Sequence, residues 1–162
     1  MGPELVAGLF GLGGALVGAV VSTGAVVWQQ RKIAHEAERM HLSGLAEAAA
    51  NECIKISYAL HKHFAEGVPD RNSSAYFQWG STGEELCRAL EEQALRFHDK
   101  PVRDFLERVH AEMYVRPEFV ADPEIWPPRY VIITSDIRTV MGTVLRRQPF
   151  PKEVWEHYPN PS

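Results

Sequence analysis

The sequence has few cysteines and no strong excess of either charge. Its 162 residues include two cysteines, Cys53 and Cys87, which are not in Cys-x-x-Cys spacing. In a cytoplasmic chain, two scattered thiols are expected to stay reduced as small core residues. Aspartate and glutamate number 21, against 17 lysines and arginines. This small acidic balance provides no electrostatic footprint for DNA or RNA, so we expect no nucleic-acid partner.

Charged side chains are entirely absent from residues 5–28, whose sequence is LVAGLFGLGGALVGAVVSTGAVVW. A helix rises about 1.5 Å per residue and the hydrocarbon core of a bilayer is about 30 Å thick. The run is therefore long enough to cross the bilayer with modest tilt. It predicts one N-terminal transmembrane helix at 5–28, after a short extracytoplasmic segment at 1–4, with the lipid bilayer as its surroundings.

Two other interpretations of this run remain open. A cleaved signal peptide normally begins with basic residues and has a shorter apolar core. Here the core is preceded by Met1, Gly2, Pro3 and Glu4, with no lysine or arginine. A buried helix of a globular core is the second alternative, although such helices average about three turns and are seldom apolar on every face.

Basic residues follow the run and none precedes it. Arg31 and Lys32 come directly after it, and Arg39 is a little further along the chain. Because lysine and arginine concentrate on the cytoplasmic side of a span, the pattern predicts a single-pass protein of the cell membrane with its N-terminus outside and its C-terminus in the cytoplasm. Trp28 is at the end of the predicted span, where tryptophan and tyrosine are enriched at the membrane–water interface. We therefore regard Trp28, Arg31 and Lys32 as interfacial anchors.

Small residues recur every four positions within the run. Such rows give a helix a smooth face that a second helix can approach closely. We predict self-association, or pairing with another membrane protein, through this face, although a glycine-rich span surrounded only by lipid remains an alternative. The candidate packing residues are Gly11, Gly14, Ala15, Gly18 and Ser22.

The remainder of the chain is patterned for helices. Residues 29–66 contain no proline and have apolar residues at steps of three and four, which predicts a long juxtamembrane helix that Ser43 and Gly44 could bend or divide. Residues 70–80 are rich in turn formers and predict an aromatic-bearing loop that folds onto the core. We expect the next helix to begin at a capping box formed by Ser81 and Glu84. A third helix is predicted after Pro101, with core residues Val102, Phe105, Leu106, Val109 and Met113.

The segment from residue 116 to residue 129 holds four prolines and predicts an extended connection. Tyr130–Thr134 resembles a strand locally, but apolar residues keep helical spacing to Arg147, so we predict a helix. Residues 149–162 form a tail rich in proline and aromatics, which either packs a short turn on the bundle or stays loose. The predicted fold class is all-α, with the transmembrane helix followed by a cytoplasmic bundle of about four helices. The long helix at 29–66 provides the first helix of this bundle, and residues 67–148 provide the remaining ones.

No motif for catalysis or metal binding is present. His61 and His63 point about 200° apart on a regular helix, so they cannot hold one ion together. The sequence has no His-Glu-x-x-His helix and no Gly-x-Ser-x-Gly elbow. A composite site, for example Cys53 or His61 with Cys87 or His98, remains an alternative. We therefore predict a protein that is not an enzyme and needs no cofactor.

Two proline-rich, aromatic segments are candidates for docking a cytoplasmic protein, because prolines reduce the entropy lost on binding. Stiff connectors would have the same composition. The candidate docking residues are Trp126, Pro127, Pro128 and Trp155.

The leading functional hypothesis is a single-pass, membrane-anchored helical protein that acts as a non-enzymatic interaction or scaffold component. In its layout, a short Gly/Ala/Val-rich anchor before a polar domain rich in Ala, Arg and Pro, the chain resembles accessory membrane proteins of plasmid spread in high-GC Gram-positive bacteria. That resemblance implies a second hypothesis, a small membrane-active protein of a mobile element that is toxic on overproduction. A membrane-tethered enzyme with a composite site is the third.

Overall fold

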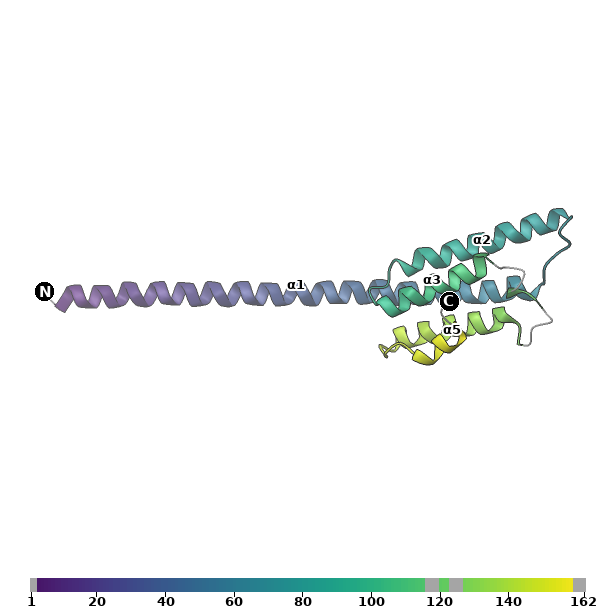
Figure 1. The fold of residues 1–162 in the computed structure, drawn as a ribbon. Coiled ribbons are helices and arrows are strands. Elements are labelled where there is room, and N and C mark those ends of the chain that lie inside the picture. The colour runs from purple at the N-terminus through teal and green to yellow at the C-terminus, as the bar shows by residue number, and fades with distance from the viewer. Residues whose placement is uncertain (1–2, 116–119, 123–126, 159–162) are drawn as a thin grey trace. The chain divides into compact units, whose positions relative to one another are not determined.

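The computed structural model describes the backbone of residues 3–115, 120–122 and 127–158, and the side chains of residues 26–114, 120–122 and 127–158. All the regular structure within these ranges is helical, which confirms the predicted fold class at the level of an all-α protein (Figure 1). Four α-helices and one 3-10 helix have defined bounds: α1 (Pro3–Ala65), α2 (Ser74–Ala94), α3 (Lys100–Val115), α5 (Arg129–Leu145) and η1 (Lys152–His157).

The chain divides into two compact units, residues 1–42 and residues 43–162. Helix α1 belongs to both, and Ser43 and Gly44 lie within it as helical residues. Within the described part of the chain, no helix has a stretch both long and apolar enough to cross a membrane. The predicted transmembrane helix at 5–28 therefore has no support here, and the side chains of residues 5–25 lie outside the described residues.

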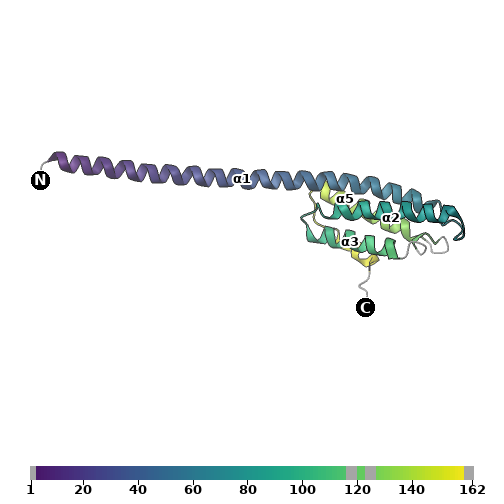
Figure 2. The ribbon, with the colours of Figure 1, turned by 90° about the horizontal axis from the view of Figure 1, so that it is seen from above.

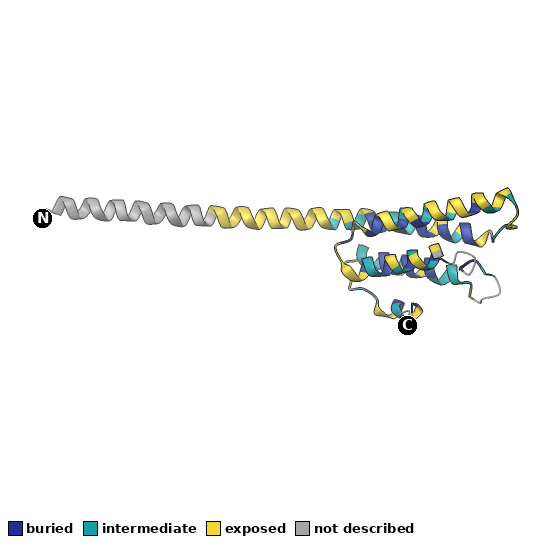
Figure 3. Ribbon diagram, turned by 45° about the horizontal axis from the view of Figure 1, so that its top comes forward, coloured by how far each residue is buried: buried dark blue, intermediate teal, exposed yellow. Residues whose placement is uncertain are grey.

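The second unit is a helical bundle made of residues 43–65 of α1 with α2, α3 and α5 (Figures 1 and 2). Helix α1 buries residues at steps of three and four, which places them on one face: Ala49, Ala50, Cys53, Ile56, Ser57, Leu60, His63 and Phe64. Helix α3 buries the five residues predicted for its core, all at most 1% exposed. Figure 3 shows buried residues concentrated where these helices face one another.

The start of α2 differs from the sequence prediction. The helix begins at Ser74, so the predictions of a loop that runs to Gly80 and of a cap at Ser81 are wrong. The N-cap is Ser73, whose side chain accepts a hydrogen bond from the Tyr76 amide at 3.2 Å. Of the predicted loop, only Asp70–Ser73 forms a turn. The backbone amide of Asn72 stabilises this turn by donating a hydrogen bond to the Asp70 carboxylate at 3.0 Å. Burial of Trp79 outweighs the local capping signal, because a helix from Ser74 places its indole in the core.

Helix α5 contains Tyr130–Thr134, which confirms the helix prediction over the strand-like local sequence. Ile133, Ile137, Val140 and Met141 of this helix are completely buried. The extended connection predicted between α3 and α5 lies largely outside the described residues, although Val120 and Ala121 are buried in the core.

The described part of the C-terminal tail is ordered against α3. Helix η1 buries Val154, and Tyr158 follows it as a residue only 4% exposed. The Phe105 ring of α3 makes edge contacts with Phe150, Trp155 and Tyr158, with centroids 5.6–6.2 Å apart. The tail therefore packs a short turn on the bundle, one of the two outcomes expected from its sequence.

Candidate functional site

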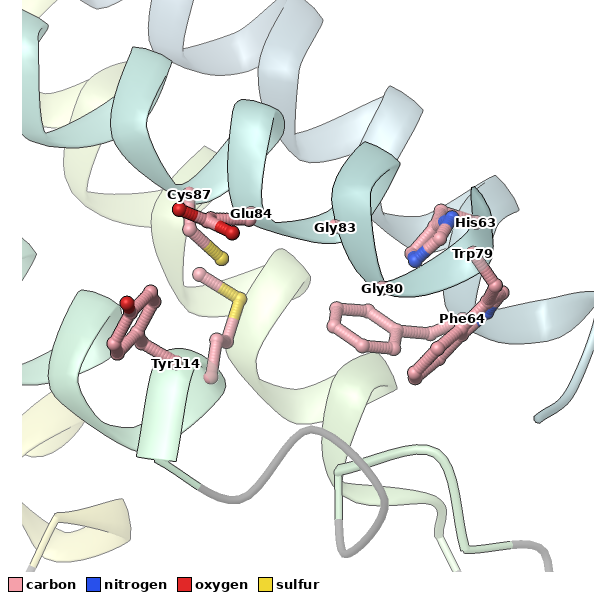
Figure 4. A pocket seen from close by; sticks show the side chains of 9 residues that line it. His63, Phe64, Trp79, Gly80, Gly83, Glu84, Cys87 and Tyr114 are labelled. Atoms are coloured by element: carbon pink, nitrogen blue, oxygen red, sulfur yellow. The ribbon is translucent and has the colours of Figure 1, made fainter. Parts of the chain in front are cut away.

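A cavity of about 350 Å³ lies where α1, α2 and α3 meet in the bundle (Figure 4). The end of α1 contributes His63 and Phe64, and α3 contributes Met113 and Tyr114. One face of α2 completes the lining with Trp79, Gly80, Gly83, Glu84 and Cys87. This is the described cavity whose lining combines aromatic rings, a histidine and a thiol, so we take it as the candidate site.

Three aromatic side chains hold one wall of this cavity in place. The His63 and Trp79 rings are stacked, with centroids 4.9 Å apart and an interplanar angle of 18°. Phe64 meets both rings edge-on, at 5.2 Å from His63 and 6.0 Å from Trp79. Stacked and edge-on pairs at these distances are favourable beyond the area they bury. The wall is therefore a packed aromatic cluster and not a set of independent side chains.

Gly83 is required for the approach of α2 to this cluster. A Cβ atom at position 83 would lie 2.9 Å from Nε2 of His63, closer than real Cβ contacts. At Gly80, by contrast, a Cβ atom would meet nothing within 4 Å. A side chain at position 83 would therefore press on His63, whereas a side chain at position 80 would have open space.

Apart from the exposed Glu84 carboxylate, the titratable side chains that line the cavity and have a shifted pKa are uncharged. Burial lowers the pKa of His63, although Glu66 acts weakly in the opposite direction, so the imidazole is uncharged at pH 7. Burial raises the pKa of the Cys87 thiol to about 12, which keeps it protonated. Glu84 is exposed and accepts a hydrogen bond from Arg88 at 2.8 Å. The lining therefore combines apolar surface, an uncharged imidazole ring and a protonated thiol.

Two ring nitrogens of the cluster have no hydrogen-bond partner among the described residues: Nε2 of His63 and Nε1 of Trp79. Both atoms are fully buried. A buried N–H without an acceptor costs free energy.

A second polar cluster joins the tail to the bundle. Arg129 donates two hydrogen bonds to the Glu112 carboxylate, one of them at 2.9 Å, and a third at 2.7 Å to the His157 carbonyl. The hydrogen bonds to Glu112 raise the pKa of Arg129, although burial acts in the opposite direction. Nδ1 of His157 lies 2.8 Å from the Asp136 carboxylate, and the Arg129 guanidinium lies 4.9 Å from the Tyr158 ring centre. This cluster connects α3, α5 and η1, so its geometry explains the docking of the tail.

No group of three or more His, Cys, Asp or Glu side chains that could hold a metal ion occurs among the described residues. The composite set considered from the sequence is not assembled there. Nδ1 of His61 is instead 3.1 Å from the Thr134 hydroxyl, and burial raises the pKa of Cys53 to about 12.

The residues predicted for membrane helix packing, Gly11, Gly14, Ala15, Gly18 and Ser22, all have side chains outside the described residues. The predicted interfacial anchors are described and exposed. Trp28 is 67% exposed, and Nζ of Lys32 lies 5.8 Å from its ring centre. Lys32 is also 3.9 Å from Glu36, while Arg31 faces solvent.

The predicted docking residues differ in their exposure. Trp126 lies outside the described residues, Pro127 is exposed and Pro128 is half-buried at the N-cap of α5. Trp155 is also half-buried, stacked on Phe150 with centroids 5.5 Å apart.

The aromatic cavity was not predicted from the sequence. The signal that could have indicated burial of His63 is its position three residues after Leu60 and next to Phe64, on the buried face of α1.

Comparisons with known proteins identify no relative for this chain: no family model, no curated protein and no solved structure matches it.

Proposed function

We propose that this chain is a single-pass, membrane-anchored protein whose helical domain binds another protein at the cytoplasmic face, without catalysing a reaction. The observation that carries this proposal is the uncharged run at residues 5–28, followed at once by Arg31 and Lys32. Such a run is more stable in hydrocarbon than in water, and the basic flank favours a cytoplasmic C-terminus.

The surface of the bundle supports a role in interaction. Large apolar side chains remain exposed on it, notably Phe77 at 74%, Leu95 at 79% and Tyr58 at 61%. Aromatic side chains of this kind supply most of the binding energy at protein interfaces. The candidate cavity supports binding in the same way, because burial keeps its Cys87 thiol protonated and lowers the pKa of His63.

Alkaline carbonate extraction of membranes tests the anchor. The wild-type chain should remain in the pellet. Replacing both Ala15 and Ala19 by arginine should release it, because each arginine near the centre of a span costs about 2.5–3.5 kcal/mol. The matched control replaces Gln29 and His35 by arginine, which adds the same charge outside the run and should leave the chain in the pellet. Release of the wild-type chain would overturn the proposal, as would a shortened chain in the medium.

The predicted orientation has its own test in intact cells. A membrane-impermeant maleimide should label a cysteine placed at Gly2 and should fail to label one placed at the exposed residue Leu95. The opposite labelling pattern would place the bundle outside the cell and remove the cytoplasmic interaction role.

A further inference from the structure

The first unit leaves large apolar side chains of α1 uncovered. Val26 is 51% exposed, Ile33 57% and Met40 70%, so the described residues bury none of them. Single exposed apolar residues are ordinary on a protein surface. These three, however, are spaced seven residues apart along one helix.

Gln30 and Ala37 complete a regular pattern with them. Val26, Gln30, Ile33, Ala37 and Met40, which we call the seam, are separated by steps of four, three, four and three. This alternation aligns side chains on one face of a helix and is the a/d repeat of a two-stranded coiled coil. Val26, Ile33 and Met40 take one of the two core positions of the repeat. Gln30 and Ala37 take the other, where Ala37 permits close approach and the polar Gln30 favours one register.

The charges of this segment lie away from the seam. Arg31, His35 and Glu38 are on the opposite side of the helix, and the ion pairs Lys32–Glu36 and His35–Glu38, each at 3.9 Å, are made within the helix. The positions that flank the seam are Gln29 and Glu36 on one side, and Ala34 and His41 on the other.

Those flanking positions are compatible with two parallel copies. In a parallel pair, a residue on one flank meets the residue five positions later on the opposite flank of the other helix. Glu36 would therefore meet His41 of the second copy, and Gln29 would meet Ala34, so no like charges face each other. A second copy in the same orientation fits this face without an unfavourable charge contact.

We propose that two copies of this chain form a short parallel coiled coil through the seam. The inference rests on the proposed membrane anchor. The seam covers fewer than the three to four heptads that define a coiled coil by pattern alone. Anchoring in one bilayer fixes a common orientation and raises the effective concentration of the two helices, which compensates for the short contact. In the sequence, the four-residue spacing of Gly14, Gly18 and Ser22 continues to Val26.

Cysteine cross-linking of the full chain in its own membranes tests this proposal. The native thiols give a low background, because Cys53 and Cys87 are 0% and 2% exposed and remain protonated. Ile33→Cys, Ala37→Cys and Met40→Cys should each give a disulfide-linked dimer on mild oxidation. The matched variants Arg31→Cys, His35→Cys and Glu38→Cys should give little, because they lie on the opposite side of the helix.

Orientation is read from a mixed experiment. Membranes that contain both a Glu36→Cys chain and a His41→Cys chain should yield more dimer than membranes with either chain alone. In the double variant Ile33→Glu, Met40→Glu, the cross-link through Ala37→Cys should fall to background while the circular dichroism of the bundle is unchanged.

Three results would overturn the coiled coil. The first is equal cross-linking at seam and opposite positions, and the second is no preference in the mixed experiment. The third is the absence of a dimer combined with a second measurement, in which a quencher carried by lipids quenches dyes attached to the seam cysteines. That result would place the seam on the membrane surface. If the chain stays in the carbonate pellet in any of these cases, only the coiled coil fails. If it is released, the anchor itself fails.

Discussion

At the residue scale, two glycines of α2 three positions apart have opposite roles. Gly83→Ala should lower the free energy of unfolding by about 1–3 kcal/mol, because the new methyl group would press on the His63 ring, which Trp79 and Phe64 hold from other sides. Gly80→Ala should raise it by about 0.5–1 kcal/mol, since an open helical glycine gains stability on replacement. Chemical denaturation followed by near-ultraviolet circular dichroism measures both, and equal effects of the two changes would contradict the steric role of Gly83.

The buried histidine of the same cluster predicts a pH dependence. The pKa of His63 is lowered in the folded chain from its usual 6.5, so below that pH the unfolded chain binds a proton that the folded chain does not. Stability should therefore fall as the pH drops through about 6.5, and level off below the lowered pKa. His63→Gln should flatten this slope of unfolding free energy between pH 8 and pH 5. The control His98→Gln changes an exposed residue and should keep the slope, and an unchanged slope in His63→Gln would contradict the prediction.

At the element scale, the helices with long periodic patterns were predictable and the boundary set by one buried side chain was not. The repeat in α5 extends over the whole helix, so it outweighs the strand-like residues at 130–134. The apolar residues on the buried face of α3 could likewise all be identified from the sequence. For α2, the signal at Ser81 and Glu84 is a valid local cap, but Trp79 contacts His63 and Phe64, which are distant in the sequence. No window around residue 79 contains that information.

Arg129 contributes to the docking of η1 together with the Phe105 contacts and the His157–Asp136 contact. Arg129→Gln should remove the bonds to Glu112 and to the His157 carbonyl. The pair is well shielded, with Arg129 14% and Glu112 23% exposed, so we expect a loss of about 1–3 kcal/mol. Hydrogen exchange should become faster at the amides of residues 152–157 before it changes in α3. Arg88→Gln breaks a more exposed pair, at 62% and 48%, and should change neither measurement. Unchanged exchange in Arg129→Gln would show that the Phe105 contacts alone hold η1.

At the scale of the whole molecule, composition and periodicity predict a helical domain well, and they predict the candidate cavity poorly. The bundle follows from apolar residues at helical spacing in four segments. The cavity follows from which faces of α1, α2 and α3 meet, and from the absence of a side chain at Gly83, which a single sequence does not reveal. His63 illustrates the difference, since its burial depends on neighbours in α2.

Association of the whole chain in membranes should depend on the small residues of the uncharged run. Replacing Gly14 and Gly18 by leucine should weaken dimerisation in a membrane reporter assay, because the bulkier side chains separate the two helices. Leu12→Ile with Leu16→Ile keeps the hydrophobicity and should leave the signal intact. A dimer signal that survives the double glycine replacement would show that the membrane contact lies elsewhere.

The two thiols of the bundle have a consequence for its maturation. Cys53 and Cys87 are enclosed by packed helices and stay in the unreactive, protonated form. The folded domain therefore needs neither an oxidant to complete it nor a reductant to protect it. Its fold is indifferent to the redox potential of the compartment that surrounds it, so oxidative stress should leave the bundle intact.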